Sequence, residues 1–309
     1  MFLTVCLNPT LQKTLCFSSV TPNAVNRTAV HRLDVSGKGI NVTRVLTQLG
    51  KEAVHLTQLG GDMKPLFLSL CEQDKLAIEW VESNSQIRFC YTLLTEIDGN
   101  VTELVEESES VTPETENLLL EKYDAIISNN CISSASCSVP SAHCSLLTAN
   151  CIIISGTKAA GFSETIIPFM VQKAKEKGMK IILDIKGNDL KECLKYEPDV
   201  IKPNMEEFTD TFKTKPTKEM LIDISQKYKC NIILTDGGKK IIAAEQDNYF
   251  EIGIEPIKAV NTIGCGDAFT AGLAAALSDG ADLITAIQEG KRCGALNAGL
   301  LKPGVIQYI

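Results

Sequence analysis

Short apolar runs rich in β-branched residues alternate along this chain with longer helical patterns. Parallel strands need long crossover connections, usually helices, so the alternation predicts an α/β fold with a mainly parallel sheet covered by helices. Several runs end in a polar residue or a glycine, and ligands bind at the carboxyl ends of the strands in such sheets. The runs lie at residues 2–7, 53–59, 125–128, 152–155, 180–184, 199–202 and 231–235.

Two segments break this alternation. Residues 11–32 are polar and turn-rich, and residues 88–105 hold two β-like runs around Asp98-Gly-Asn100, which is a hairpin signal. Both are expected to form a small sheet that projects from the main domain and covers a cleft, with an ordinary surface excursion as the alternative. No linker or repeat divides the 309 residues, which predicts one domain with a small appendage. Residues 129–149 show no clear period and receive no assignment.

The chain is acidic, with 38 Asp and Glu residues against 30 Lys and Arg residues. This balance argues against a nucleic-acid partner, for which a basic stripe is expected. The apolar N-terminal residues 1–7 lack the basic region and the length of a signal peptide or membrane span, and they are interpreted as the first strand. We therefore expect a cytoplasmic protein without a membrane partner.

The 12 cysteines are interpreted mainly as small buried apolar residues, because several lie inside apolar runs. A zinc site is the minor alternative, since the spacing is poor and no C-x-x-C pair occurs among the candidates. These candidates are Cys131, Cys137, Cys144 and Cys151, with His143 nearby.

The motif Gly264-Cys-Gly-Asp267 opens a helix of small residues. Free backbone N–H groups at a helix start suit a polyphosphate, and glycine lets the backbone approach it closely. The alternative is structural, because an aspartate in the first turn also complements the helix dipole.

The segment Lys202-Pro-Asn204 leads into a helix that carries Glu207. Asn204 and Glu207 are three positions apart and share one helix face. They can hold Mg²⁺ through water beside nucleotide phosphates. A capping box is the interpretation that the sequence alone favours, and the two roles are compatible.

Glycines also follow the run that ends at Thr235, in Thr235-Asp-Gly237 and Gly238. They predict either a phosphate-binding loop or a hairpin turn into the next strand, residues 241–245. The glycine spacing from Gly264 onward does not match a dinucleotide fingerprint, and a Walker A motif is absent from the sequence.

A second glycine-rich helix start lies at Gly37-Lys38-Gly-Ile-Asn41. Lys38 and Asn41 can bind an anionic group and a polyol there. The alternative is a glycine turn with a solvated lysine.

Together these motifs resemble the ribokinase-like (PfkB) carbohydrate kinases, in particular the 1-phosphofructokinase and tagatose-6-phosphate kinase branch. The resemblance implies a three-layer α/β sandwich with a mainly parallel central sheet and a small β-sheet lid, which often serves as a dimer clasp. Residues 1–309 would form a single kinase domain, with lid segments at about 11–35 and 86–106. The motifs, in register over nearly the whole chain, lie at residues 7–9, 25–28, 37–46, 154–156, 202–207 and 261–267.

The resemblance implies a role for each matching position. Asp267 would take the proton of the acceptor hydroxyl, and the amides of Gly264, Cys265 and Gly266 would bind the transferring phosphoryl group. Glu207 and Asn204 resemble the magnesium and phosphate elements. The remaining ATP-side positions are Lys202, Thr235, Gly237 and Asn297, and those on the sugar side are Gln12, Arg27, Gly37, Lys38, Asn41, Arg88 and Thr157.

Several positions depart from the family pattern. Gln12 stands where an aspartate is usual, and Lys158 and Lys186 replace an apolar and a small residue. One interpretation is that these lysines recognise a substrate phosphate that is different or differently placed from the one usual in the family. The alternative is that they are surface side chains that point away from the cleft. Cys265 stands where alanine is usual, and a thiol at a helix N-terminus can have a lowered pKa. We therefore expect alkylation or oxidation of Cys265 to block phosphate entry and bound ATP to slow that reaction.

The predicted function is ATP- and Mg²⁺-dependent phosphoryl transfer to a hydroxyl of a sugar phosphate of the fructose 1-phosphate or tagatose 6-phosphate type. A homodimer through the lid is a further expectation. One alternative is a kinase for an unphosphorylated sugar or nucleoside, against which Arg27, Arg88 and Lys38 argue. Another is a catalytically silent sensor of sugar phosphates or nucleotides, suggested by Gln12 and opposed by the retained Asp267.

Overall fold

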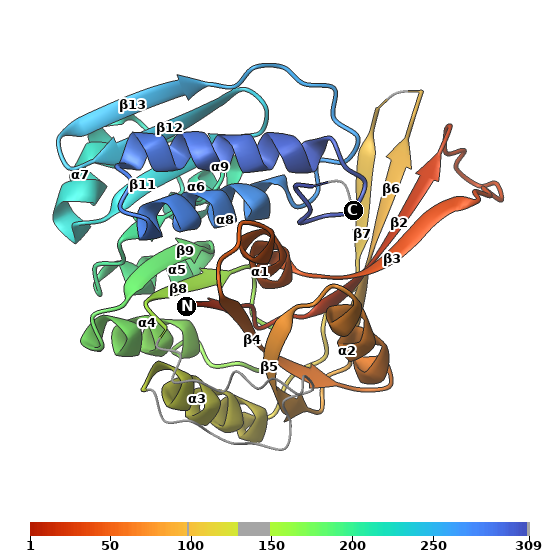
Figure 1. The fold of residues 1–309 in the computed structure, drawn as a ribbon, viewed down its shortest axis with the longest axis horizontal. Helices are drawn as coiled ribbons and strands as arrows, with labels where there is room; N and C mark the ends of the chain where they lie inside the picture. Colours follow the sequence, from red (N-terminus) through yellow and green to blue (C-terminus); the bar gives the residue numbers. More distant parts are fainter. Residues whose placement is uncertain (98, 129–148, 308–309) are drawn as a thin grey trace.

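The computed structural model describes residues 1–97, 99–128 and 149–307. Within these ranges the main sheet has the strand order β13-β12-β11-β10-β9-β8-β1-β4-β5, and all strands from β11 to β5 are parallel. The mainly parallel sheet predicted from the alternation is therefore confirmed (Figure 1). Its strands are β1 (Phe2–Val5), β4 (Ala53–Gly60), β5 (Ala77–Ser83), β8 (Cys151–Ser155), β9 (Lys180–Asp184), β10 (Val200–Ile201), β11 (Asn231–Asp236), β12 (Lys240–Glu245) and β13 (Asn248–Gly253).

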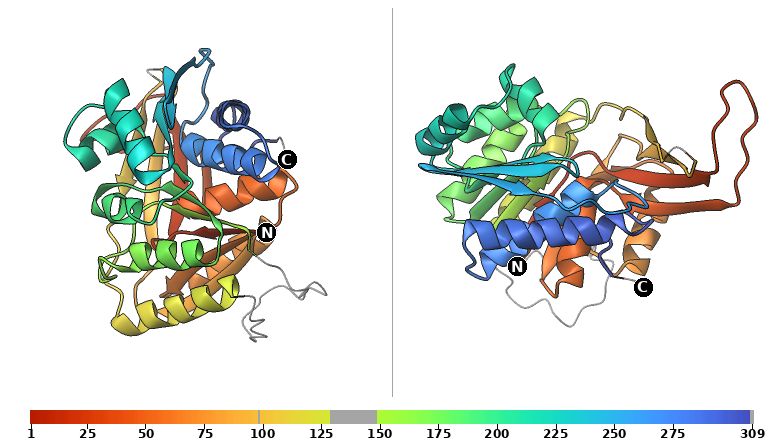
Figure 2. Two further views of the ribbon diagram at one scale, coloured as in Figure 1. Left: turned by 90° about the vertical axis from the view of Figure 1, so that its left-hand side faces the viewer. Right: turned by 90° about the horizontal axis from the view of Figure 1, so that it is seen from above.

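Helices cover both faces of this sheet and give the three layers of a sandwich (Figure 2). One face packs against α3 (Pro113–Ile127), α4 (Ile166–Glu176), α5 (Gly187–Leu194), α6 (Met205–Phe212) and α7 (Lys218–Tyr228). The other face packs against α1 (Lys38–Gln48), α2 (Lys64–Gln73), α8 (Cys265–Ser278) and α9 (Leu283–Ala298). None of the described helices is both long and apolar enough to span a membrane.

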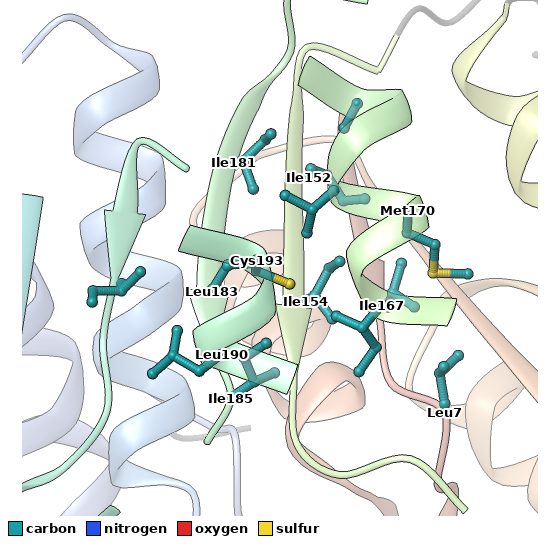
Figure 3. Close-up of a cluster of buried hydrophobic side chains, with 14 of the residues drawn as sticks. Leu7, Ile152, Ile154, Ile167, Met170, Ile181, Leu183, Ile185, Leu190 and Cys193 are labelled. Atoms are coloured by element: carbon teal, nitrogen blue, oxygen red, sulfur yellow. The ribbon is translucent and has the colours of Figure 1, made fainter. Parts of the chain in front are cut away.

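Side-chain alternation along the strands builds the two core layers. On β8, Ile152 and Ile154 point to the α4 and α5 side, where Figure 3 shows them against Ile167 and Leu190. Ile153 belongs to the opposite cluster, with α8 and α9. Parallel strands buried on both faces are therefore apolar at most positions, which is why these runs lack a regular polar alternation.

The two segments that break the alternation pair with each other in a second sheet, of order β3-β2-β6-β7. β2 lies between β3, its antiparallel neighbour, and β6, its parallel neighbour. The sheet projects from the main sheet at the carboxyl end of β1 (Figure 1), which confirms the expected small sheet, called the lid below. Its strands are β2 (Thr10–Phe17), β3 (Val30–Ser36), β6 (Arg88–Thr95) and β7 (Val101–Val105).

The expected strand at residues 125–128 is wrong. Residues up to Ile127 belong to α3, and Ser128 is its C-cap. Leu119, Tyr123 and Ile127 recur every four residues and are all buried, so the helical period of the longer segment decides the structure. A window of four residues is too short to display that period.

The proposed zinc ligands Cys131, Cys137, Cys144 and His143 lie outside the described residues, as does the rest of the unassigned segment up to residue 148. Cys151 is described, and it is a buried residue of β8.

Tyr123 gives a test of the packing between α3 and α4. Its hydroxyl donates to the carbonyl oxygen of Met170 at 2.6 Å, and its side chain is fully buried. Tyr123→Phe is expected to lower the free energy of unfolding by about 1 kcal/mol in a denaturant titration, because one buried hydrogen bond is lost. Tyr249→Phe is the control, since the Tyr249 hydroxyl donates to the exposed carboxylate of Glu251. Equal losses in the two variants would contradict this reading of the α3–α4 contact.

Candidate active site

The first turn of α8 places its backbone N–H groups at the edge of the main sheet. Gly264, at the N-cap position, has φ 84° and ψ −5°, the left-handed conformation that favours glycine. A Cβ atom at Gly264 would lie 2.9 Å from the backbone nitrogen of Gly304. No side chain caps this helix end, although the N–H of Cys265 donates to Thr262 at 3.3 Å. The start of α8 is therefore shaped to receive an anion.

Asp267 lies in the same turn and is 6% exposed. Its Oδ2 atom accepts a hydrogen bond of 2.8 Å from Nδ2 of Asn41, on α1. Burial raises the pKa of Asp267 to about 6, against the lowering effect of Lys38. A carboxylate that titrates near neutral pH is well matched to taking a proton from a hydroxyl. The structure thus joins two motifs that lie far apart in the sequence.

A buried ion cluster lies behind this turn. Asp184, at the end of β9, is 1% exposed and accepts ion pairs from Lys38 at 3.1 Å and Lys202 at 3.3 Å. The hydroxyl of Thr270, one turn after Gly266 on α8, also donates to Asp184, at 3.0 Å. Burial opposes the ionisation of Asp184, but the two ammonium groups outweigh it and lower its pKa. The carboxylate therefore holds both lysines beside the start of α8.

Lys38 and Lys202 differ in what they can reach. Lys38 also contacts Oε1 of Glu207 at 3.4 Å. Burial lowers the pKa of Lys38, but the carboxylates of Asp184 and Glu207 outweigh burial and raise the pKa above its usual value. The ammonium of Lys202 lies 3.9 Å from the position that a Cβ atom of Gly266 would take. Among the described residues, no other cationic side chain lies within 4 Å of that position.

The capping box at Asn204 and Glu207 is confirmed. Asn204 Oδ1 accepts from the Glu207 N–H at 2.7 Å, and Glu207 Oε2 accepts from the Asn204 N–H at 2.9 Å. Oδ1 of Asn204 and both carboxylate oxygens of Glu207 therefore contact protein donors. The described residues hold no cluster of three or more His, Cys, Asp or Glu side chains able to bind a metal. This donor set fits Mg²⁺ held through its water shell, and it does not fit direct coordination.

The glycines after Thr235 form a hairpin turn, since β11 and β12 pair antiparallel on either side of them. Gly237 has φ 54°, and Asn204 forms a parallel β-bridge with Thr235. The turn therefore lies next to the capping box, at the carboxyl edge of the sheet.

Asn297, on α9, is fully buried. Its Nδ2 atom donates to the carbonyl oxygens of Lys302 and Val305, at 3.2 and 3.0 Å. Its Oδ1 atom lies 3.0 Å from the Cβ position of Gly264. The amide thus joins the C-terminal segment to the turn before α8.

The lid meets the main sheet at a group of polar atoms without partners. Three buried atoms, Asn8 Oδ1, Ser155 Oγ and Arg88 Nε, have no hydrogen-bond partner among the described residues. The Nδ2 atom of Asn8 donates to Thr157 at 3.3 Å. Since buried polar atoms are normally paired, these atoms indicate a polar ligand at this junction.

Gln12 lies within the lid sheet, and Arg27 lies in a loop at its outer end. The amide of Gln12 is 3% exposed and donates to Thr92 within the lid sheet. Arg27 is exposed in the β2–β3 loop, which projects from the molecule (Figure 2), and lines a hollow with Glu96. The structure of the single chain therefore does not bring Arg27 to Asp267.

The two lysines that depart from the family pattern have other roles. Lys158 pairs with Asp189 at 2.6 Å and with Glu164 at 3.2 Å. Lys186 is an exposed side chain at the N-cap position of α5. Because its charge is already neutralised, Lys158 is a poor phosphate ligand, although its side chain is only 13% exposed. The surface interpretation fits Lys186 alone.

The lowered pKa expected for Cys265 is wrong. Burial raises the pKa of this thiol to about 12, and the nearby Asp267 adds to the increase. The thiolate is the reactive form, so the structure does not favour rapid alkylation of Cys265. The helix dipole expected to lower the pKa is outweighed by loss of contact with water.

Sequence reasoning missed the pairing role of Asp184 and the contacts of Thr270 and Arg44. Asp184 had a usable signal, because it is a charged residue at the end of a buried strand. Arg44 follows Asn41 by three positions on α1, so its contact with that amide could have been expected.

The sequence matches the profile of the pfkB family carbohydrate kinases over residues 16–304. The chain therefore belongs to the pfkB family and is a carbohydrate kinase. Its fold is similar to that of phosphofructokinase-2 from Escherichia coli in complex with substrates and products, at 20% identity and a TM-score of 0.83, over 96% of this chain and 92% of that chain. A possible 1-phosphofructokinase from Thermotoga maritima is 21% identical, with a TM-score of 0.83 over 97% of this chain and 92% of that chain. These neighbours confirm the ribokinase-like fold.

The raised pKa of Asp267 predicts a stability cost that varies with pH. An unfolded aspartate titrates near pH 4, so between about pH 4 and 6 the folded state binds more protons and loses stability as the pH rises. Asp267→Asn removes this cost. The variant is expected to be more stable than wild type by about 2 to 3 kcal/mol at pH 8, with no difference below about pH 4, in denaturant titrations. Asp223→Asn, at an exposed position, serves as the control. A gain that does not depend on pH would contradict the burial of an ionised Asp267.

Proposed function

We propose that this carbohydrate kinase transfers the γ-phosphoryl group of ATP to a hydroxyl of a sugar phosphate of the fructose 1-phosphate or tagatose 6-phosphate type. The observation that carries the proposal is the hydrogen bond between Asn41 and Asp267, which joins the turn at Gly37 to the uncapped start of α8. Asp267 acts as the general base for the acceptor hydroxyl. A carboxylate with a pKa of about 6 is ionised at neutral pH and can accept that proton.

The start of α8 stabilises the charge of the phosphoryl group during transfer. The amides of Gly264, Cys265 and Gly266 form the anion hole, with Gly266 the most accessible of the three. Lys202 lies under this turn and adds a fixed positive charge. Phosphoryl transfer depends mainly on in-line placement and on such stabilisation of the equatorial oxygens.

The nucleotide lies along the edge formed by the capping box and the β11–β12 turn. Thr235 and Gly237 contact its phosphates, with Asn204 beside them across the β-bridge. Asn297 supports the adenine side indirectly, because its buried amide holds the C-terminal segment in place. Glu207 and Asn204 would hold Mg²⁺ through water, and the ion would neutralise charge on the ATP phosphates.

The sugar lies at the junction of the lid and the main sheet. The unpaired atoms of Asn8, Ser155 and Arg88 offer an acceptor, a hydroxyl and a donor to a polar ligand. Thr157, Gly37 and Asn41 border this place, while Gln12 shapes the lid above it. Arg88 binds the phosphate already present on the substrate, since its Nη1 atom bonds only the carbonyl oxygen of Glu106, at 3.2 Å, among the described contacts.

An unphosphorylated acceptor is the second candidate, and one observation favours it. Lys38 is held by Asp184 and Glu207, and Arg27 lies in the projecting loop, so Arg88 alone among these three cations faces the junction. A catalytically silent sensor is disfavoured by the intact surroundings of Asp267. We further propose a cytoplasmic homodimer through the lid, because β7 exposes Val101, Leu104 and Val105.

An ADP-release assay over a panel of sugars and sugar phosphates tests the reaction. Asp267→Asn is expected to lower kcat by about 10² to 10⁴, the usual contribution of a general base, while ATP binding measured by calorimetry is unchanged. Asp223→Asn is the matched control at an exposed site. Wild-type turnover by Asp267→Asn would sink the assignment of the base, and no turnover on any acceptor would favour the sensor.

Arg88→Gln distinguishes the two acceptor classes. If Arg88 binds a substrate phosphate, the KM for the sugar phosphate is expected to rise by about tenfold or more while the KM for ATP is unchanged, because a charge-assisted hydrogen bond is lost. Lys158→Gln, which removes a lysine already paired with carboxylates, is the control. An unchanged KM for the sugar phosphate in Arg88→Gln would favour the unphosphorylated acceptor.

A further inference from the structure

Arg44, on α1, is a buried arginine outside the motifs considered so far, with 4% of its surface exposed. Its guanidinium group has five N–H donors, and five hydrogen bonds account for them. Nε and Nη2 donate to Oδ2 of Asp74 at 3.0 and 2.8 Å, and Nη2 also donates to the carbonyl oxygen of Val35 at 2.7 Å. Nη1 donates to the carbonyl oxygen of Pro303 and to Oδ1 of Asn41, both at 2.9 Å.

These contacts determine which way the Asn41 amide points. A guanidinium group only donates and an ionised carboxylate only accepts, so the amide oxygen must face Arg44 and the amide nitrogen must face Asp267. The reverse orientation would place two donors against each other and two acceptors against each other. The hydroxyl of Ser36 lies 3.5 Å from Oδ1 of Asn41, which agrees with this orientation.

Other groups hold the guanidinium group in place next to Asn41. Asp74, the C-cap residue of α2, binds it on one side and also binds Lys302. On another side, a Cβ atom at Gly304 would lie 2.8 Å from Cα of Asn41 and 3.0 Å from Nη1 of Arg44. Helix α1, helix α2 and the C-terminal segment therefore enclose the arginine.

We propose that Arg44 is a positioning residue that holds the Asn41 amide so that it donates to Asp267 and keeps this carboxylate ionised and oriented as the base. The proposal rests on the proposed role of Asp267. Arg44 acts through Asn41, and none of its five hydrogen bonds is with Asp267 itself.

Several other groups also act on Asp267. Lys38 from α1 and Lys202 after β10 favour its ionised form, and Asp184 from β9 opposes it. Cys265 precedes it in the same helix and is un-ionised at neutral pH, because burial raises its pKa to about 12. Asn41 is the neutral donor in this set, and its effect depends on its orientation and not on its own charge.

Arg44→Lys tests the proposal, since lysine keeps the charge opposite Asp74 and loses the planar set of donors. The acid limb of the kcat profile is expected to move up by about one pH unit, because the ionised carboxylate loses its donor; kcat then falls about fivefold at pH 6 and about tenfold at pH 5 and below. The KM for ATP is expected to stay the same. Arg292→Lys is the control, because Arg292 also donates from two nitrogens to one carboxylate, that of Glu289, on the surface of α9.

A double-mutant cycle separates positioning from a general structural role. If Arg44 acts through Asn41, Arg44→Lys in an Asn41→Ala background moves the acid limb no further. A shift of the same size in both backgrounds would overturn the proposal. So would a lower melting temperature in Arg44→Lys with an unmoved acid limb.

A direct titration of the Asp267 carboxyl by NMR, on protein with ¹³C-labelled aspartate, makes the test independent of turnover. The signal is assigned by its absence in Asp267→Asn. An upward shift of the Asp267 pKa in Arg44→Lys supports the positioning role of Arg44 even if no acceptor is phosphorylated. The absence of phosphorylation would refute the proposed function and leave this result unchanged. If Arg44→Lys does not fold, Asp74→Asn is titrated in its place, with a smaller upward shift expected, and an unmoved signal there overturns the proposal.

Discussion

The carboxylate of Asp184 is buried between two lysines. Burying a charge is costly unless it is paired and hydrogen-bonded, and here Lys38, Lys202 and Thr270 meet that need. The three partners come from the start of α1, the loop after β10 and α8. A single carboxylate thus fixes the relative position of the elements that carry both helix starts of the candidate site.

Much of the fold follows from local patterns in the sequence. The buried parallel strands were recognisable because they are short, apolar and separated by helices, and the hairpin signal around residue 99 revealed one half of the lid. The capping box at Asn204 and Glu207 was predictable for the same reason, since its two hydrogen bonds join residues three positions apart. The strand expected at residues 125–128 failed because the helical period of α3 extends beyond so short a window.

The rest depends on contacts between distant segments, which local patterns do not contain. The pKa of Cys265 is set by how deeply the folded chain buries it, and a motif at a helix start does not convey that depth. Lys158 is neutralised by Asp189, 31 positions later. The contact of Arg44 with Pro303 joins residues 259 positions apart. Sequence reasoning therefore predicts candidate site residues more readily than it predicts their contacts.

The hydrogen bond between Asn41 and Asp267 spans 226 positions of the chain. During synthesis at about 5 to 20 residues per second, the turn at Gly37 leaves the ribosome about 10 to 45 s before the residue that completes it. Throughout that interval the nascent chain carries the turn at Gly37 without helix α8, which holds the other half of the candidate site. The candidate site is therefore completed only late in synthesis, after the first strands of the main sheet have emerged.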